Sequence, residues 1–234
     1  MDRKTRKDIK TDKFAEEIGH TFEFLTSHTA ETKRYAAIGL AVILVAGGIY
    51  YYVHHQAGVR EEALAAAIKI DNAQISTTPQ PPNLTFATQE EKDKARAKAL
   101  NDLKTKYHGT QEGSIAGMFL AADEADKSNY AQAEKLYRDV MDSAPAEYSS
   151  LARVSLAQVL AAQGKTADAE KLMRDLISHP TAMVSKEQAQ LQLAQILIPT
   201  NPSEARKLLQ PLTTARTAIS KAAIDEMGKV PQTN

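Results

Sequence analysis

The chain has 234 residues, and its 29 basic side chains balance 29 acidic ones to a net charge of zero. This length allows one medium domain with an accessory segment, or two small domains, and excludes a large multidomain enzyme. A neutral chain is a poor ligand for nucleic acid, where basic surface supplies most of the affinity. The absence of Cys excludes disulfides, thiolate metal sites and Cys nucleophiles. With no Trp and 38 Ala, the composition is typical of close-packed helices.

The first predicted element is an uncharged, strongly apolar stretch at residues 35–53, which reads YAAIGLAVILVAGGIYYYV. As a helix it would be about 28 Å long, close to the thickness of the hydrocarbon core of a bilayer. A buried core helix is disfavoured because no other segment is apolar enough to surround it. A cleavable signal peptide would be shorter and nearer the start. The stretch therefore predicts an uncleaved transmembrane helix.

The orientation of this helix follows from the basic residues on its two sides. Eight Lys and Arg precede it, whereas Arg60 is the only one in the 15 residues after Val53. By the positive-inside rule the N-terminus stays in the cytoplasm. In a bacterial inner membrane, the remainder of the chain would then be periplasmic.

Two linking regions flank the predicted helix. In the N-terminal tail, Phe14, Ile18, Phe22 and Leu25 form an amphipathic stripe that could lie on the membrane, dock a partner or belong to a frayed tail. The Pro-rich stretch at 77–83 must break any helix continuing to about Ile75. It could be a loop within a first helix pair or a flexible linker.

Beyond this region the sequence repeats itself with a period of 36 residues. AEKLYRDV at 133–140 recurs as AEKLMRDL at 169–176, then as ARKLLQPL at 205–212, and more weakly as AKALNDLK at 97–104. Two sets of positions come into register: Ala97, Ala133, Ala169 and Ala205, and Leu100, Leu136, Leu172 and Leu208. A second helical pattern precedes each of the last three copies, at 118–123, 155–160 and 192–197, with turn-forming residues between the two patterns. Paired helices are predicted.

These helix pairs resemble tetratricopeptide repeats, a family with small and large residues at fixed positions of both helices and a terminal Pro. The positions that match in the best repeat are Leu120, Ala121, Asn129, Tyr130, Ala133, Tyr137, Val140 and Pro145. Those that match in the next are Leu156, Ala157, Gly164, Ala169, Met173, Leu176 and Pro180. The usual Trp is missing and the period exceeds the usual 34 residues, so the repeats are divergent.

The sequence thus predicts an all-α chain in which one transmembrane helix precedes an α-solenoid of divergent helix pairs. We expect a cytoplasmic tail at 1–34, the transmembrane helix at 35–53 and the repeat domain at 54–234, with clear repeats at about 113–212. This layout is similar to that of the bacterial single-span family that includes the ancillary subunit of the Sec translocon. The resemblance implies a chaperone-like adaptor whose partners are export channel components, translocating chains or periplasmic chaperones. A structural subunit of another cell-envelope complex is the alternative.

No catalytic residue, metal site or cofactor site is expected, and the chain is not expected to be an enzyme. None of the six His forms a pair at the helical spacing that metal sites use, and phosphate-binding and nucleophile motifs are missing. The remaining class of function is protein binding. Repeat proteins usually bind partners in the groove lined by their first helices. Projected from the family, the groove residues are Met118, Ala122, Ala125, Val154, Gln158, Ala161, Leu191 and Gln195. These side chains could instead simply pack between repeats.

Overall fold

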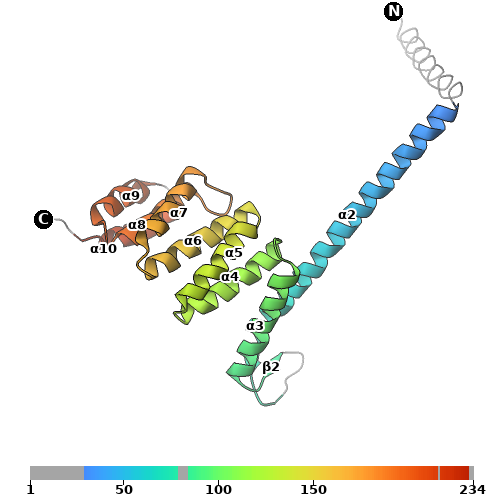
Figure 1. Ribbon diagram of the computed structural model, residues 1–234. Coiled ribbons are helices and arrows are strands. Elements are labelled where there is room, and N and C mark those ends of the chain that lie inside the picture. The colour runs from blue at the N-terminus through green and yellow to red at the C-terminus, as the bar shows by residue number, and fades with distance from the viewer. Residues whose placement is uncertain (1–28, 79–83, 216, 232–234) are drawn as a thin grey trace, which may run out of the picture. The chain divides into compact units, whose positions relative to one another are not determined.

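The computed structural model describes residues 29–78, 84–215 and 217–231. Nine helices and two very short strands make up this part of the chain, which confirms the predicted fold class (Figure 1). The elements are α2 (Thr29–Asp71), β1 (Gln74–Ile75), β2 (Thr85–Phe86), α3 (Gln89–Lys106), α4 (Gln111–Asp126), α5 (Tyr130–Ser143), α6 (Ala146–Ala162), α7 (Thr166–Ser178), α8 (Lys186–Leu197), α9 (Pro202–Thr214) and α10 (Ile219–Lys229). The amphipathic stripe of the N-terminal tail lies outside the described residues.

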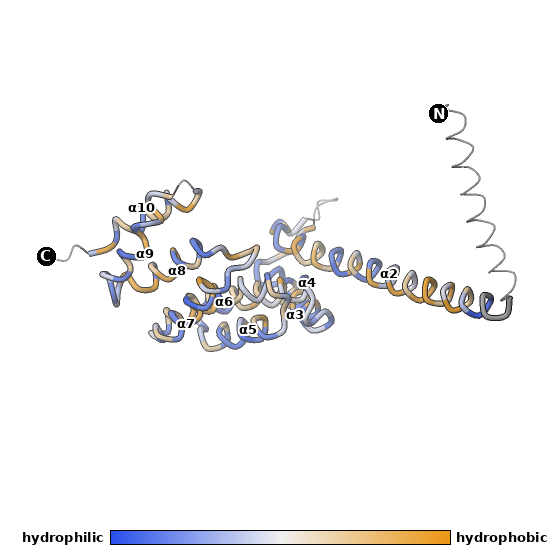
Figure 2. Tube along the Cα trace, turned by 90° about the horizontal axis from the view of Figure 1, so that it is seen from above, coloured by the Kyte–Doolittle hydropathy of each residue, from blue (hydrophilic) through white to orange (hydrophobic). Residues whose placement is uncertain are grey.

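Helix α2 contains the predicted transmembrane segment. Residues 33–71 of this helix are long and apolar enough to cross a membrane, and none of its most apolar window is buried against protein. Figure 2 shows the apolar residues of α2 along its first half and more polar residues towards its end. The chain divides into two compact units at residues 58 and 59, so α2 runs from one unit into the other.

The second unit is a stack of antiparallel helix pairs in which each helix contacts the next one along the chain. Pairing follows the predicted repeats: α4 with α5, α6 with α7, and α8 with α9. The first helices α4, α6 and α8 also contact one another in sequence, as expected for a solenoid. The final helix, α10, which the sequence analysis did not predict, packs on α9 and α8.

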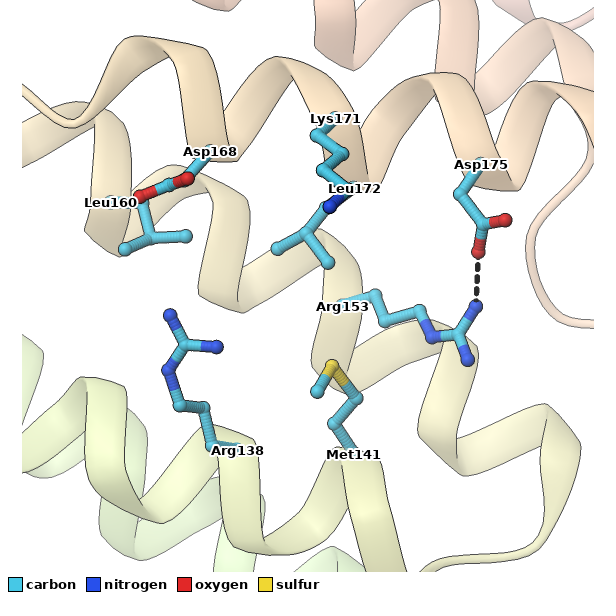
Figure 3. A pocket seen from close by; sticks show the side chains of 8 residues that line it. All are labelled: Arg138, Met141, Arg153, Leu160, Asp168, Lys171, Leu172 and Asp175. Carbon is cyan, nitrogen blue, oxygen red and sulfur yellow. Dashed lines mark hydrogen bonds and ion pairs between the residues drawn. The ribbon is translucent and has the colours of Figure 1, made fainter.

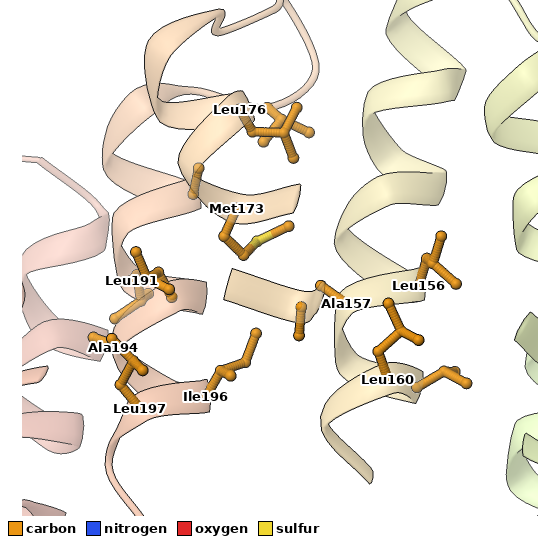
Figure 4. Packing of buried hydrophobic residues seen from close by; sticks show 14 of the residues in the cluster. Leu156, Ala157, Leu160, Met173, Leu176, Leu191, Ala194, Ile196 and Leu197 are labelled. Carbon is orange, nitrogen blue, oxygen red and sulfur yellow. The ribbon is translucent and has the colours of Figure 1, made fainter. Parts of the chain in front are cut away.

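Two clusters of buried side chains hold this unit together. The larger one runs from α4 to the end of α10, and Figure 4 shows its centre, which contains Leu156 and Leu160 of α6, Met173 and Leu176 of α7, and residues of α8. The smaller cluster joins Ala67 of α2 to residues of α3 and α4. The end of α2 therefore packs as the partner of α3, while most of the Pro-rich stretch lies outside the described residues.

The turns after α4 and α6 need an unusual backbone conformation. Gly164 adopts a φ of 76° between α6 and α7, and Ser128, one period earlier, adopts a φ of 62° between α4 and α5. Only glycine enters this left-handed region at little cost. The glycine that matches the repeat family at Gly164 is thus explained by the left-handed backbone conformation of the turn. Ser128 adopts the same conformation at the cost of some backbone strain.

The predicted register holds for three copies and is wrong for the first. Ala133, Ala169 and Ala205 are all completely buried, whereas Ala97 is only half-buried. In α5, α7 and α9 the large buried residues are Tyr137, Met173 and Leu209, but the equivalent position of α3 is the exposed Asn101. Helix α3 buries Leu100 and Leu103 instead, one residue earlier. The helix is rotated because the polar residues Asn101 and Lys104 occupy the positions that the later copies bury.

Two further details differ from the expectation. Helix α2 ends at Asp71, earlier than Ile75, and the residues after it form a short parallel pair in which Gln74 lies opposite Thr85. The Gln74 amide donates to the Leu84 carbonyl at 3.1 Å, and the Ser76 amide to the Phe86 carbonyl at 2.9 Å. Periodicity gave no sign of strands this short.

Ion pairs link neighbouring second helices along the outer side of the stack. Lys104 of α3 contacts Asp139 of α5 at 2.7 Å, and Lys165, just before α7, contacts Glu134 of α5 at 2.7 Å. Arg174 of α7 contacts Glu204 of α9. The hydrogen bond from Lys165, with further ones from Arg138 and Gln163, lowers the pKa of Glu134 to about 2.

This lowered pKa predicts an acid-dependent loss of stability. A carboxyl whose pKa is lower in the folded than in the unfolded chain stabilises the fold above its ordinary value of 4.5 and loses that contribution as the pH falls towards 2. Glu134→Gln should therefore lower the free energy of unfolding of a 59–234 fragment at pH 7, and the difference from wild type should shrink between pH 5 and pH 3. Urea unfolding at several pH values measures this. A difference that stays constant with pH would contradict the assignment.

Candidate protein-binding surface

The exposed sides of α4, α6 and α8 form one continuous face, which we call the first-helix face. Helical periodicity explains this face, because each of these helices places its small and large apolar residues on the side that is buried in the core. Leu120 and Ala121 of α4, Leu156 and Ala157 of α6, and Leu193 and Ala194 of α8 are buried at equivalent positions. The residues on the opposite sides of the same helices are left for solvent or a partner.

The predicted groove residues fall in three groups on this face. Gln158 is exposed, and six others are half-buried: Met118, Ala122, Ala125, Val154, Ala161 and Gln195. Leu191 is only 7% exposed and belongs to the core. Its side chain fills the space between helices and offers little surface to a ligand. Met118, Ala125, Val154 and Ala161 also pack against the core with part of their surface.

The polar part of the face is hydrogen-bonded within the chain. The Gln158 side-chain amide of α6 donates to the Gln192 side-chain oxygen of α8 at 2.7 Å. The Gln195 amide of α8 donates to the Glu226 carboxylate of α10 at 3.1 Å. These amides link neighbouring helices, so they already have partners without a ligand. On the side of the face towards α8 and α10, the polar side chains are therefore hydrogen-bonded to neighbouring helices.

The apolar part of the face lies on α4 and α6 and is larger than the sequence suggested. Phe119 is 38% exposed, and Ile115 and Leu151 are half-buried. With Met118, Ala122 and Val154 these side chains form what we call the apolar patch. The three residues missed by the projection sit at helical spacing from those it included, so the spacing along α4 and α6 was a signal that could have found them.

Charged groups lie on the two helices that form the apolar patch and on the helices next to them. The Arg96 guanidinium of α3 lies 5.7 Å from the centre of the Phe119 ring and pairs with two carboxylates, Asp71 at 2.9 Å and Asp123. Arg60 pairs with the buried Glu112 at 3.0 Å. Asp126 at the end of α4 and Glu147 at the start of α6 are exposed and form no ion pair within the described residues.

A separate hollow of about 380 Å³ lies between the second helices α5 and α7, with α6 beneath it (Figure 3). Its charged groups are of both signs: Arg138, Arg153 and Lys171 against Asp168 and Asp175. Arg153 contacts Asp175 at 2.6 Å. Arg138 also pairs with Glu134 at 2.9 Å, so the three basic groups have three carboxylates near them and the hollow favours no ligand of a single charge.

No group of three potential metal-ligating side chains comes together in the part of the chain that the structure describes. The adjacent His54 and His55 point to different sides of α2, where each stacks on a tyrosine one turn earlier. The ring centres of Tyr50 and His54 are 5.9 Å apart, and those of Tyr51 and His55 are 6.0 Å apart.

Comparison with known protein families matches residues 31–187 to a family described as the tetratricopeptide repeat-like domain. The match includes most of the apolar helix as well as the stack from α3 to α7. The chain belongs to the tetratricopeptide repeat-like domain family. Members of this type mediate protein–protein interactions and are typically not catalytic. Comparison with curated proteins gave no match, and neither did comparison with solved structures.

Proposed function

We propose that this protein is a membrane-anchored scaffold that acts as a chaperone-like adaptor near the protein export machinery. Its partners would be channel components, translocating chains or periplasmic chaperones, bound on the first-helix face. The observation that carries the proposal is the exposed apolar patch on α4 and α6 of a tetratricopeptide repeat-like domain. Apolar side chains that remain exposed next to each other on a folded surface mark interaction sites.

The anchor supports the location of this activity. The apolar helix allows a single crossing of the membrane at 35–53, and the basic residues ahead of it favour a cytoplasmic N-terminus. In the proposed layout a cytoplasmic tail at 1–34 precedes the helix, and the domain at 54–234 is periplasmic. A domain tethered in this way would meet chains as they leave an export channel in the inner membrane.

The proposed orientation predicts opposite labelling of two engineered cysteines, each unique because the chain has none of its own. Lys135 is exposed on α5, so Lys135→Cys should react with a membrane-impermeant thiol reagent in intact spheroplasts. Ser27→Cys should react only after the membrane is permeabilised. The reverse pattern would place the domain in the cytoplasm and remove the link to exported chains.

Site-specific photo-crosslinking in native membranes tests the binding surface. A photoreactive residue at the exposed Gln158 should give discrete crosslinked products, whereas one at Lys135 on a second helix should not. Val154→Glu should reduce the products from Gln158, because a partner would have to desolvate the new carboxylate. Equal crosslinking from both positions would contradict binding on the first-helix face. A single stoichiometric partner, instead of many chains, would favour the structural-subunit alternative.

A further inference from the structure

Binding on the first-helix face is asymmetric, because its two halves differ in chemistry. The amides of Gln158 and Gln195 are engaged by neighbouring helices, at 2.7 Å and 3.1 Å. Each of these hydrogen bonds uses one N–H of the amide and orients the side chain towards a neighbouring helix, so this half of the face is polar and gains little from burial under a ligand. The apolar patch on α4 and α6 has no such competing partner, so it is the half that offers surface for burial.

Within the patch, Phe119 has the largest side chain and is the most exposed aromatic residue outside α2 among the described residues. Large aromatic residues dominate the energetics of protein interfaces when a partner buries them. The neighbours Ile115, Met118 and Ala122 lie on the same side of α4, spaced so that they surround it. The centre of binding therefore lies on α4.

Negatively charged groups outnumber positively charged ones around the patch. Arg96, which lies over the Phe119 ring, is paired with both Asp71 and Asp123, and on the neighbouring turns Arg60 is paired with Glu112 and Lys127 with Glu124. Arg96 faces two carboxylates, which leaves one negative charge in that cluster. The exposed Asp126 and Glu147 add two more, at the end of α4 and the start of α6.

We propose that the apolar patch binds an amphipathic helix of a partner protein, and that this helix carries Lys or Arg beside its apolar residues. The proposal rests on the proposed function, because it specifies the ligand of the same face. Apolar side chains of the partner pack on Phe119 and its neighbours. Basic side chains at the margins meet the excess carboxylates, and such pairs across an interface give specificity and speed association.

Three synthetic helical peptides test this inference on the full-length protein in nanodiscs of zwitterionic lipid. They share one apolar stripe and carry Lys, Glu or Gln at the flanking positions. Fluorescence anisotropy should show the Lys peptide binding at least tenfold more tightly than the Glu peptide, with a preference that weakens at high salt. The double variant Asp126→Lys, Glu147→Lys should reverse the preference. Equal affinity for the three peptides would overturn the charge assignment.

A matched pair of variants tests the position of the patch. Phe119→Glu should reduce binding of the Lys peptide at least tenfold, although the added carboxylate attracts its charges, because the apolar contact is lost. Met183→Glu makes the same kind of change at a residue that is 44% exposed in the loop before α8, and it should leave binding unchanged. Unchanged binding in a folded Phe119→Glu variant would overturn the inference. Circular dichroism establishes that both variants are folded.

The outcomes separate this inference from the proposed function. Crosslinks from Gln158 in native membranes, together with equal affinity for the three peptides, would support the scaffold role and contradict the basic helix as its ligand. If neither crosslinks from Gln158 nor a preference among the peptides were found, the scaffold role would be contradicted as well.

Discussion

Replacing Ala169 by lysine is expected to lower the free energy of unfolding of the 59–234 fragment by about 3–5 kcal/mol, among the larger effects of single substitutions. Ala169 is completely buried in the core cluster, on the helix that packs between α6 and α8. Lysine would have to force a long chain into a close contact and bury an unpaired ammonium group. Chemical denaturation monitored by circular dichroism measures the change.

The control is the same substitution two residues earlier on the same helix. Ala167 is exposed, so Ala167→Lys should cost less than about 1 kcal/mol. Glu170 is less suitable as a control because it pairs with Arg174 at 2.6 Å. Equal stabilities of the Ala169→Lys and Ala167→Lys variants would show that the repeat register is wrong.

Gly113→Ala is expected to destabilise the fragment by about 2–4 kcal/mol, although alanine is the better helix former. A Cβ atom at Gly113 would lie 2.1 Å from the Tyr107 carbonyl oxygen, where the end of α3 crosses the start of α4. That neighbour is backbone, so the two helices would have to move apart. The sequence analysis gave this glycine no structural role, because a close approach between helices leaves no trace in periodicity.

Gly228→Ala in α10 is the matched control for this prediction. A Cβ atom there would meet nothing within 4 Å. The substitution should stabilise the fragment by about 0.5–1 kcal/mol through helix propensity and a less flexible unfolded chain. If both variants gained stability, the close contact at Gly113 would be refuted.

Sequence was a good guide wherever a feature depended on periodicity. The helix pairs from α4 to α9 and their turns follow from the 36-residue repeat, and the apolar helix follows from hydropathy alone. Helix α10 was missed because it lies beyond the last recognisable copy, although Ile219, Ala223 and Met227 are spaced by four residues. The short strands pair through backbone atoms, which a sequence pattern of two residues cannot indicate.

The candidate surface was predicted only in part, for a physical reason. A projected face identifies the side of a helix, but exposure depends on how far neighbouring helices cover that side. Leu191 is covered, whereas Phe119 is not. The charge imbalance likewise depends on which ions meet, and Arg96 meets two carboxylates that are 52 residues apart in the chain.

The rotated register of α3 bears on how such a chain can change in length during evolution. Helices α5, α7 and α9 begin at residues 130, 166 and 202 and bury equivalent positions, so a duplicated or deleted block of 36 residues among them would find the same packing partners. A block that included α3 would present Asn101 where its neighbours require a large apolar side chain. We therefore expect growth or loss of whole repeats to be tolerated in the middle and later part of the stack, and the pair that contains α3 to stay as a single copy.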